Sequence, residues 1–361
     1  MSGGNGTRGA AIQACAGGSA AGTDALSDRA TGENFPVALR ILPRAYRRNL
    51  MAVYRFARLV DDIGDEQFPL LAGWVATDVA ETTDRTGDRL RALDAVEDDL
   101  DRAFSAEAAA PGATSPGATS PGATARLGVI REVARTAADC AIPAEPFRML
   151  IEANRQDQKV GRYATFDDLL AYCRLSANPV GRVVLHIFGA ATPERERLSD
   201  LVCTALQLAE HWQDVAEDFA RGRVYLPRED MAAFGCVEAD LKLAAAPPSV
   251  RELMRFETER AGRLLAEGAP LIGTLHGWAR LAVAGYVAGG RATLAAIAAA
   301  GSTPATPATP ATPATPATPA TPAASAAPDA SPAGFDVLSV TPRPGRARTA
   351  AALIRAYLRG R

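Results

Sequence analysis

Apolar residues recur at steps of three and four through most of this 361-residue chain. That spacing places them on one face of an α-helix, whereas a half-buried strand shows strict alternation. Clear strand alternation is absent, and 48% of the residues are hydrophobic, which is ample for a core. The sequence therefore predicts an all-α protein, with helices over residues 44–65, 68–104, 125–140, 144–158, 166–189, 194–221, 249–267, 270–299 and 347–359.

Two low-complexity segments interrupt this helical pattern. One repeats Pro-Gly-Ala-Thr over residues 111–124, and a Thr-Pro-Ala triplet repeats from Thr303 to Ala323. Proline at every third position prevents a helix and favours extended, solvated chain, so these segments are interpreted as insertions or linkers. We expect a disordered leader at 1–30, an all-α domain at 31–300 with an insertion at 106–125, a linker at 301–334, and a C-terminal helix of the same domain at 335–361.

Charge and cysteine usage exclude several classes of function. The net charge is −2, so no basic surplus indicates a nucleic-acid partner. The cysteines are scattered and form no C-x-x-C pair, which argues against a disulfide framework or a structural zinc site. A reducing compartment fits this usage, and we expect a cytoplasmic protein. The cysteines are Cys15, Cys140, Cys173, Cys203 and Cys236.

Two further motifs are set aside. The N-terminal Gly4-x-Gly6-x-x-Gly9 lacks the preceding strand and following helix that a dinucleotide site needs. The longest apolar stretch, 270–300, is interrupted by His276 and two arginines, so no membrane span is expected.

Two predicted helices carry ladders of acidic residues. In the first, Tyr54, Arg58, Asp61, Asp62 and Asp65 share a stripe beside an apolar one formed by Val53, Phe56, Val60 and Ile63. In the second, the acids are Glu210, Asp214, Glu217 and Asp218. Like charges at this spacing repel, so something should offset them. One interpretation is a solvated surface with Arg221 and Arg223 nearby.

The other interpretation is a metal site between the two helices. Facing each other across a helical bundle, the ladders would form the oxygen-only site that Mg²⁺ prefers, completed by substrate phosphates. Such a site would bind a diphosphate and stabilise it as a leaving group. A dry cavity would protect the resulting carbocation, and aromatic rings would stabilise it. Candidate rings are Phe188, Tyr172, Tyr163, Phe219 and Tyr225, although ordinary core packing is the preferred explanation for any one of them.

The chain resembles the squalene/phytoene synthase family, and within it the hydroxysqualene-forming branch. The resemblance rests on ENFPVALRILP at 33–43, Y-x3-R-x2-DD-x2-DE at 54–66, RYATFDDLLAYCRLSANPVGR at 162–182, WQDVAEDFARGRVYLP at 212–227 and FDVLSVTPRPGRAR at 335–348. It implies the isoprenoid synthase fold, a single large helical bundle with a central cavity. The Ala-Asn-Pro-Val-Gly turn at 177–181 favours the hydroxysqualene branch.

The resemblance also implies residue roles. The implied Mg²⁺ ligands are Asp61, Asp62, Asp65, Asp214 and Asp218, and the catalytic set adds Tyr54 and Arg58. The implied substrate-binding residues are Arg58, Arg223, Tyr225, Tyr172, Ala177, Asn178, Val180 and Gly181. The chain departs from the family at Glu210 and His211, where the family usually has Asn, often followed by Phe. Glu210 still offers an oxygen and is included among the expected metal ligands.

The implied reaction is Mg²⁺-dependent conversion of presqualene diphosphate to hydroxysqualene, with water as nucleophile and without NADPH. An upstream presqualene diphosphate synthase and a downstream desaturase are the implied partners. One alternative is head-to-head condensation of farnesyl or geranylgeranyl diphosphate. Another is a non-catalytic helical assembly protein. The basic residues of 343–361 predict either peripheral membrane contact or a helix packed on the domain with solvated arginines.

Overall fold

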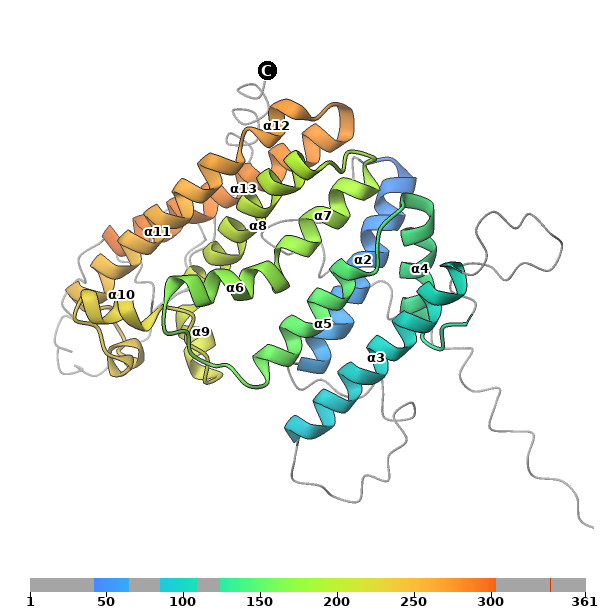
Figure 1. Cartoon of the computed structure of the whole chain (residues 1–361). Coiled ribbons are helices and arrows are strands. Elements are labelled where there is room, and N and C mark those ends of the chain that lie inside the picture. The colour runs from blue at the N-terminus through green and yellow to red at the C-terminus, as the bar shows by residue number, and fades with distance from the viewer. Residues whose placement is uncertain (1–41, 65–84, 109–123, 303–337, 339–361) are drawn as a thin grey trace, which may run out of the picture.

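The computed structural model describes residues 42–64, 85–108, 124–302 and Leu338. Within these ranges the regular elements are helices, and an isolated bridge between Arg162 and Val224 is the sole β-type pairing (Figure 1). The predicted all-α class is therefore confirmed. The helices are α2 (Arg44–Gly64), α3 (Arg85–Ala108), α4 (Gly128–Cys140), α5 (Glu145–Asp157), α6 (Phe166–Ser176), α7 (Asn178–Ile187), α8 (Pro193–Gln213), α9 (Val215–Ala220), α10 (Arg228–Ala233), the 3-10 helix η1 (Glu238–Lys242), α11 (Pro248–Gly268), α12 (Leu271–Thr274) and α13 (Gly277–Ser302).

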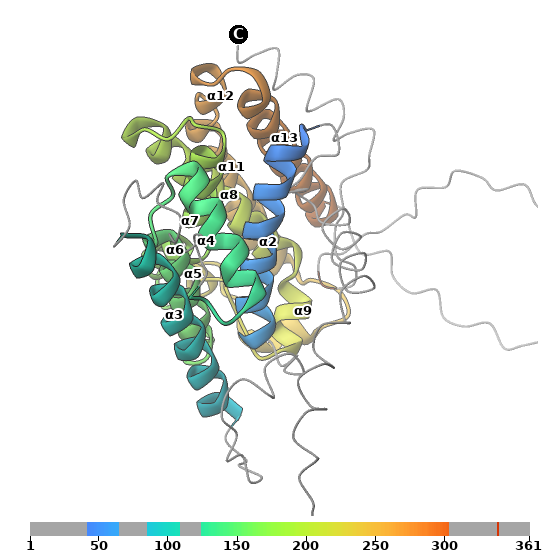
Figure 2. The ribbon, with the colours of Figure 1, turned by 90° about the vertical axis from the view of Figure 1, so that its right-hand side faces the viewer.

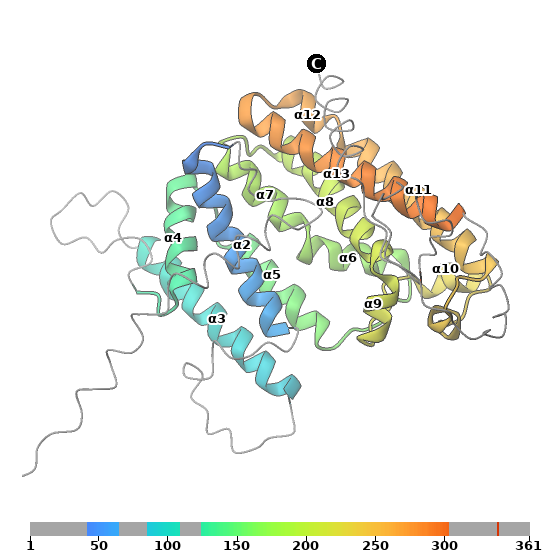
Figure 3. The same cartoon turned by 180° about the vertical axis from the view of Figure 1, so that it is seen from behind.

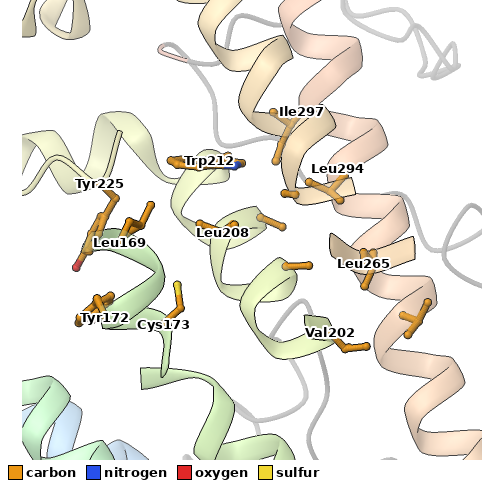
Figure 4. Close-up of a cluster of buried hydrophobic side chains, with 14 of the residues drawn as sticks. Leu169, Tyr172, Cys173, Val202, Leu208, Trp212, Tyr225, Leu265, Leu294 and Ile297 are labelled. Atoms are coloured by element: carbon orange, nitrogen blue, oxygen red, sulfur yellow. The ribbon is translucent and has the colours of Figure 1, made fainter. Parts of the chain in front are cut away.

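Two hydrophobic clusters hold these helices together. The N-terminal cluster lies among α2, α3, α4, α5 and α7, and its centre includes an edge-on contact of Phe56 with Phe147 at 5.3 Å. The second cluster joins α6, α8, α11 and α13, with Trp212 fully buried (Figure 4). Helices α7 and α8 pack on each other and so connect the two clusters (Figures 1 and 2).

Helix α2 follows its sequence pattern closely. The apolar stripe of Val53, Phe56, Val60 and Ile63 is buried. Helix α2 is described as far as Gly64, and the predicted end at residue 65 lies outside the described residues. Burial of this face removes large apolar side chains from water, which is the main favourable contribution to folding. The neighbouring polar stripe is therefore held at a fixed place against the rest of the bundle.

Several predicted helix boundaries are wrong. The stretch 166–189 is divided at Ala177, because Pro179 has no N–H and suits the first turn of a new helix, α7. The stretch 270–299 is divided into α12 and α13 by the turn at Leu275–His276, and Gly277 adopts a φ of +53° that favours glycine. Helix α3 continues to Ala108, beyond the predicted end at residue 104. The sequence pattern did not predict α10 or η1.

Other predicted segments lie outside the described residues. These are the leader at 1–30, most of the linker at 301–334, the start of the helix predicted over 68–104, and the C-terminal helix at 347–359. From the C-terminal segment, Leu338 alone is described, and it is buried within the second cluster.

The apolar stretch for which no membrane span is expected corresponds mainly to helix α13. Residues Gly277–Ala300 are long and apolar enough to span a membrane by length and composition, with a mean hydropathy of 1.4. However, 61% of this stretch is buried inside the protein. Figure 3 shows α13 alongside α11, and both helices contact α8. The apolar character of α13 is thus that of a helix in a protein core.

Candidate active site

A cavity of about 560 Å³ lies between the two hydrophobic clusters. Most of its wall is apolar, contributed by α2, α7, α8 and α13, among them Val53, Val180, Val184, Leu185, Val202, Leu206 and Val283. Its volume falls in the usual range for small-molecule sites. A cavity of this kind excludes water from a bound hydrocarbon chain.

Acidic residues from both predicted ladders line this one cavity. Asp61 comes from α2, whereas Glu210, Asp214 and Glu217 come from the end of α8 and from α9. Tyr54 and Arg58, two turns and one turn before Asp61 respectively, line it as well. The solvated-surface interpretation of the ladders is therefore wrong for Asp61, Glu210 and Asp214, which are half-buried, whereas Glu217 is exposed and lies 3.9 Å from Arg221, as that interpretation expected. The cavity combines an apolar wall with carboxylates and a guanidinium.

Asp61 has a partner that the sequence analysis missed. Asn154 of α5 is buried, and its Nδ2 donates to Asp61 Oδ1 at 3.2 Å and to the Leu150 carbonyl at 3.2 Å. One turn later, Gln158 Nε2 donates to the carbonyl of Gly64, the last residue of α2. Asn154 and Gln158 thus attach the acidic end of α2 to α5. Their spacing of four residues on one helix is the signal that could have indicated a shared polar face.

The remaining acids of α2 differ in placement. Asp62 accepts a hydrogen bond from Arg58 Nη2 at 3.4 Å and is not among the residues that line the cavity. Asp62 therefore serves, in this structure, to orient the Arg58 guanidinium. Asp65, the other acid of the expected motif, lies outside the described residues.

The second acidic ladder bends at Asp214. The stretch predicted as one helix over 194–221 divides there, since the Asp214 backbone leaves the helical conformation with φ −105° and ψ 18°. The hydrogen bonds from Asp214 N to Glu210 O and from Asp218 N to Asp214 O, at 2.9 and 2.8 Å, nevertheless continue. A single-residue bend of this kind does not disturb the spacing of side chains, so the sequence pattern does not reveal it.

Asp218 lies on a different surface from the other acids of its ladder. It lines a small second pocket with His211, Arg223 and Tyr225. Burial, and next the neighbouring Asp214 carboxylate, raise the pKa of Asp218 to about 7. A positive charge near this pair would relieve the repulsion between the two carboxylates.

An aromatic cluster packs beside the cavity. The His211 and Tyr225 rings stack at 3.7 Å, Tyr163 and Tyr172 pack against Tyr225, and the Tyr172 hydroxyl donates to Asp157 Oδ2 at 2.8 Å. Figure 4 shows Tyr172 and Tyr225 of this cluster. Burial, followed by the charge of Arg223, lowers the pKa of His211 to about 3, so the imidazole is neutral. The cluster is a packed part of the core.

Several of the predicted substrate-binding residues lie away from the lining of the main cavity, and their substrate role stays a prediction. Tyr172, Arg223 and Tyr225 are not among the residues that line the main cavity, and neither are Phe188, Tyr163 and Phe219. Asn178 is buried, and its Oδ1 accepts from Thr204 Oγ1 at 3.0 Å, so it joins α7 to α8. The structure places Ala177, Val180 and Gly181 on the lining as expected, and the aromatic rings there are Tyr54 and Tyr286.

The donor set suits a hard cation that is completed by a ligand. The acids on the main cavity offer oxygen atoms, which Mg²⁺ prefers. In the part of the chain that the structure describes, no three His, Cys, Asp or Glu side chains form a ready-made metal site. This arrangement fits cations that take some ligands from each wall and the rest from substrate phosphate and water.

Comparison with known proteins agrees with this geometry. Residues 28–314 match the family model described as squalene/phytoene synthase. The hydroxysqualene synthase of Rhodopseudomonas palustris is 32% identical over 240 residues, which cover 66% of this chain and 70% of the relative. A phytoene synthase of Mycobacterium tuberculosis is 29% identical over 247 residues, covering 68% and 70%.

Solved structures resemble the chain too. The squalene synthase HpnC from Alicyclobacillus acidocaldarius is 39% identical with a TM-score of 0.61, covering 77% of this chain and 93% of that one. A dehydrosqualene synthase in complex with a ligand has a TM-score of 0.65 at 18% identity, covering 94% and 96%, and supports the fold alone. The chain has the isoprenoid synthase fold and belongs to the squalene/phytoene synthase family. It is an enzyme that processes prenyl diphosphates.

Proposed function

We propose that this enzyme converts presqualene diphosphate to hydroxysqualene and diphosphate in a Mg²⁺-dependent reaction that uses water and no NADPH. The observation that carries the proposal is the single cavity in which carboxylates and Arg58 share one lining with an extended apolar wall. Such a lining suits a ligand with a charged diphosphate and a long hydrocarbon part. The similarity to hydroxysqualene synthases supports the choice of branch.

The chain's own residues have distinct parts in this proposal. Asp61 on one wall, and Glu210 and Asp214 on the other, would hold Mg²⁺; Asp65 and Asp218 remain proposed ligands by resemblance. Bound Mg²⁺ supplies Lewis-acid stabilisation of the departing diphosphate. Arg58 adds a planar, permanently charged donor group for phosphate oxygens, oriented by Asp62 at 3.4 Å.

The apolar wall protects the carbocation. After diphosphate departs, the positive charge lies on carbon, and bulk water would quench it at several positions. Val180, Val184 and Leu185 of α7 line one side of the cavity and keep that water out. Gly181 allows α7 to lie close against α8, because a Cβ there would lie 2.5 Å from Cys203 Sγ and closer still to Ser199 Oγ.

A second candidate is head-to-head condensation, the synthesis of presqualene diphosphate or phytoene from two shorter prenyl diphosphates. The favouring observation is that phytoene synthases match at 29% identity, close to the 32% of a hydroxysqualene synthase. The acidic lining does not separate the two reactions, because both begin with loss of a diphosphate.

Product analysis tests the proposal. Purified protein is incubated with Mg²⁺ and without NADPH, in one tube with presqualene diphosphate and in another with farnesyl diphosphate. Hydroxysqualene from the first tube alone is the expected result. Presqualene diphosphate from the second tube alone would favour condensation. A folded protein with no product in either tube, or in a tube with geranylgeranyl diphosphate, would contradict both candidates.

A further inference from the structure

The connection between α5 and α6 runs beside the chain that follows α9 (Figure 1). Arg162 and Val224 form a parallel bridge there, and the Val224 N–H donates to the Gly161 carbonyl at 2.9 Å. The approach is close, because a Cβ on Gly161 would lie 3.3 Å from the Gly222 carbonyl oxygen. Gly222 has a φ of +82°, which favours glycine, and it forms the turn that follows α9. Two segments that are distant in the sequence are thus joined at this turn.

The Arg162 side chain fixes the turn. Its Nη1 donates to the Gly222 carbonyl at 2.6 Å and to the Gly161 carbonyl at 2.7 Å. Its Nε and Nη2 donate to the two carboxylate oxygens of Glu238, in η1, at 2.7 and 2.9 Å. A guanidinium is planar and carries its donors in a rigid fork, so the bidentate pair with Glu238 sets the plane in which Nη1 meets the turn. A lysine ammonium is a point charge on a flexible stem and has no such fork.

The turn carries Arg223, which is a predicted substrate-binding residue. The residues immediately before and after Arg223 are the ones bonded to the α5–α6 connection. The N–H of Arg223 donates to the Asp218 carbonyl at 2.8 Å, and both residues line the second pocket. Asp214, one turn before Asp218, lines the main cavity. Arg223 is therefore held beside the second acidic ladder by contacts on each side of it.

We propose that Arg162 positions Arg223 to bind the diphosphate group of the substrate. This inference rests on the proposed function, in which cations held by the acidic residues bind that diphosphate. A guanidinium fixed beside such a cation site adds a permanent charge and paired donors for phosphate oxygens. Its contribution depends on its placement, since a displaced donor loses much of its effect. Arg162 does not touch the substrate; it is a positioning residue that acts through the turn at Gly222.

Binding of inorganic diphosphate at saturating Mg²⁺ tests this role, because it measures the affinity of the site without any chemical step. In calorimetric titrations, Arg223→Gln should weaken binding about tenfold or more, the usual cost of losing a hydrogen bond to a charged group. Arg162→Lys should weaken it about fivefold or more, because lysine keeps the charge but not the fork that holds the turn. The matched control is Arg182→Lys, which breaks another half-buried bidentate pair, with Asp200 at 3.2 and 2.8 Å, between α7 and α8.

A double variant separates positioning from a purely structural role. Arg162→Lys added to Arg223→Gln should weaken diphosphate binding by no more than about twofold beyond Arg223→Gln alone, because both changes remove the same contact. Urea unfolding of Arg162→Lys and Arg182→Lys measures the stability that each loses and verifies that each is folded. A purely structural role predicts equal effects of these two variants on diphosphate binding.

Three results would overturn the inference. One is unchanged diphosphate affinity in Arg162→Lys or Arg223→Gln, another is an equal loss of affinity in Arg182→Lys, and the third is full additivity in the double variant. Wild-type protein that binds diphosphate but forms no product from presqualene diphosphate would contradict the proposed reaction alone, because the expected affinities of the variants would still support the role of Arg162. Wild-type protein that binds no diphosphate would overturn both.

Discussion

The side-chain amide of Asn154 donates a hydrogen bond of 3.2 Å to Asp61 Oδ1, across the contact between α5 and α2. Of the two described acids of the first ladder, Asp61 lines the cavity and Asp62 does not. A neutral donor fixes one carboxylate oxygen without neutralising its charge, so the other lone pairs stay available to a cation. Partners of this kind orient metal ligands and commonly affect metal affinity.

We therefore expect Asn154→Leu to weaken the use of Mg²⁺. The half-saturating Mg²⁺ concentration should rise roughly tenfold or more, the usual cost of losing an outer-sphere partner. The matched control is Asn49→Leu, because Asn49 is as buried as Asn154, at 8% exposure, but bonds Cys140 Sγ instead. Both variants should lose about 1–3 kcal/mol of stability. A magnesium requirement that rises equally in both would contradict the role of Asn154.

Gly64 gives a second test of the same contact. A Cβ at this position would lie 2.5 Å from Asn154 Oδ1, which is too close for any real contact. Gly64→Ala should therefore displace the Asn154 amide from Asp61. The half-saturating Mg²⁺ concentration should then rise, as it does in Asn154→Leu. At Gly262 of α11, where a Cβ meets nothing within 4 Å, alanine should stabilise the helix by about 0.5–1 kcal/mol. Magnesium titrations and urea unfolding of both variants measure these effects.

The parts that could be predicted from sequence depend on repeated, local signals. The stripe of Val53, Phe56 and Val60 specifies the buried face of α2, and the residues beside that stripe then face the cavity. Acidic residues at steps of three and four similarly indicate a shared face for Glu210, Asp214 and Glu217. Helical periodicity alone is sufficient for such predictions.

The parts that could not be predicted depend on tertiary geometry. The Asn154–Asp61 contact joins residues 93 positions apart, and no local pattern specifies which helices will be neighbours. Asn178 and Tyr172 have side chains suited to ligand binding, yet their hydrogen bonds are made to Thr204 and Asp157 inside the protein. Residue type indicates what a side chain can do, whereas packing decides what it contacts.

Glu210 provides a test of the departure from the family pattern. It lines the same cavity as Asp61 but comes from α8, one turn before Asp214. With its carboxylate as a magnesium ligand, Glu210→Ala should raise the half-saturating Mg²⁺ concentration at least tenfold. Glu210→Asn should retain much of the wild-type affinity for Mg²⁺, because an amide oxygen also coordinates hard cations. Equal magnesium titration curves for wild type and Glu210→Ala would contradict the ligand role.

The last prediction concerns a carboxyl group of α11, a helix that contributes no residue to the lining of the main cavity. Glu257 is fully buried, and Arg260 Nη1 lies 3.4 Å from each of its carboxylate oxygens. Arg260 also makes shorter bonds of 2.8 and 3.2 Å to Asp230 of α10. Burial is the main cause that raises the pKa of Glu257 to about 8; Arg260 opposes it, while Asp230 and Glu229 add to it.

The raised pKa of Glu257 determines how the stability of the protein depends on pH. Between the ordinary carboxyl pKa and pH 8, the folded protein binds a proton at Glu257 that the unfolded chain has released, so stability falls as pH rises. Relative to Glu257→Gln, the wild type should lose about 3 kcal/mol of unfolding free energy between pH 5 and pH 8. Urea unfolding at several pH values measures this difference. Glu267→Gln, at an exposed position of the same helix, is the control and should run parallel to the wild type. A Glu257→Gln curve that is also parallel to the wild type would show that Glu257 is ionised in the folded protein, held by Arg260 in spite of its burial.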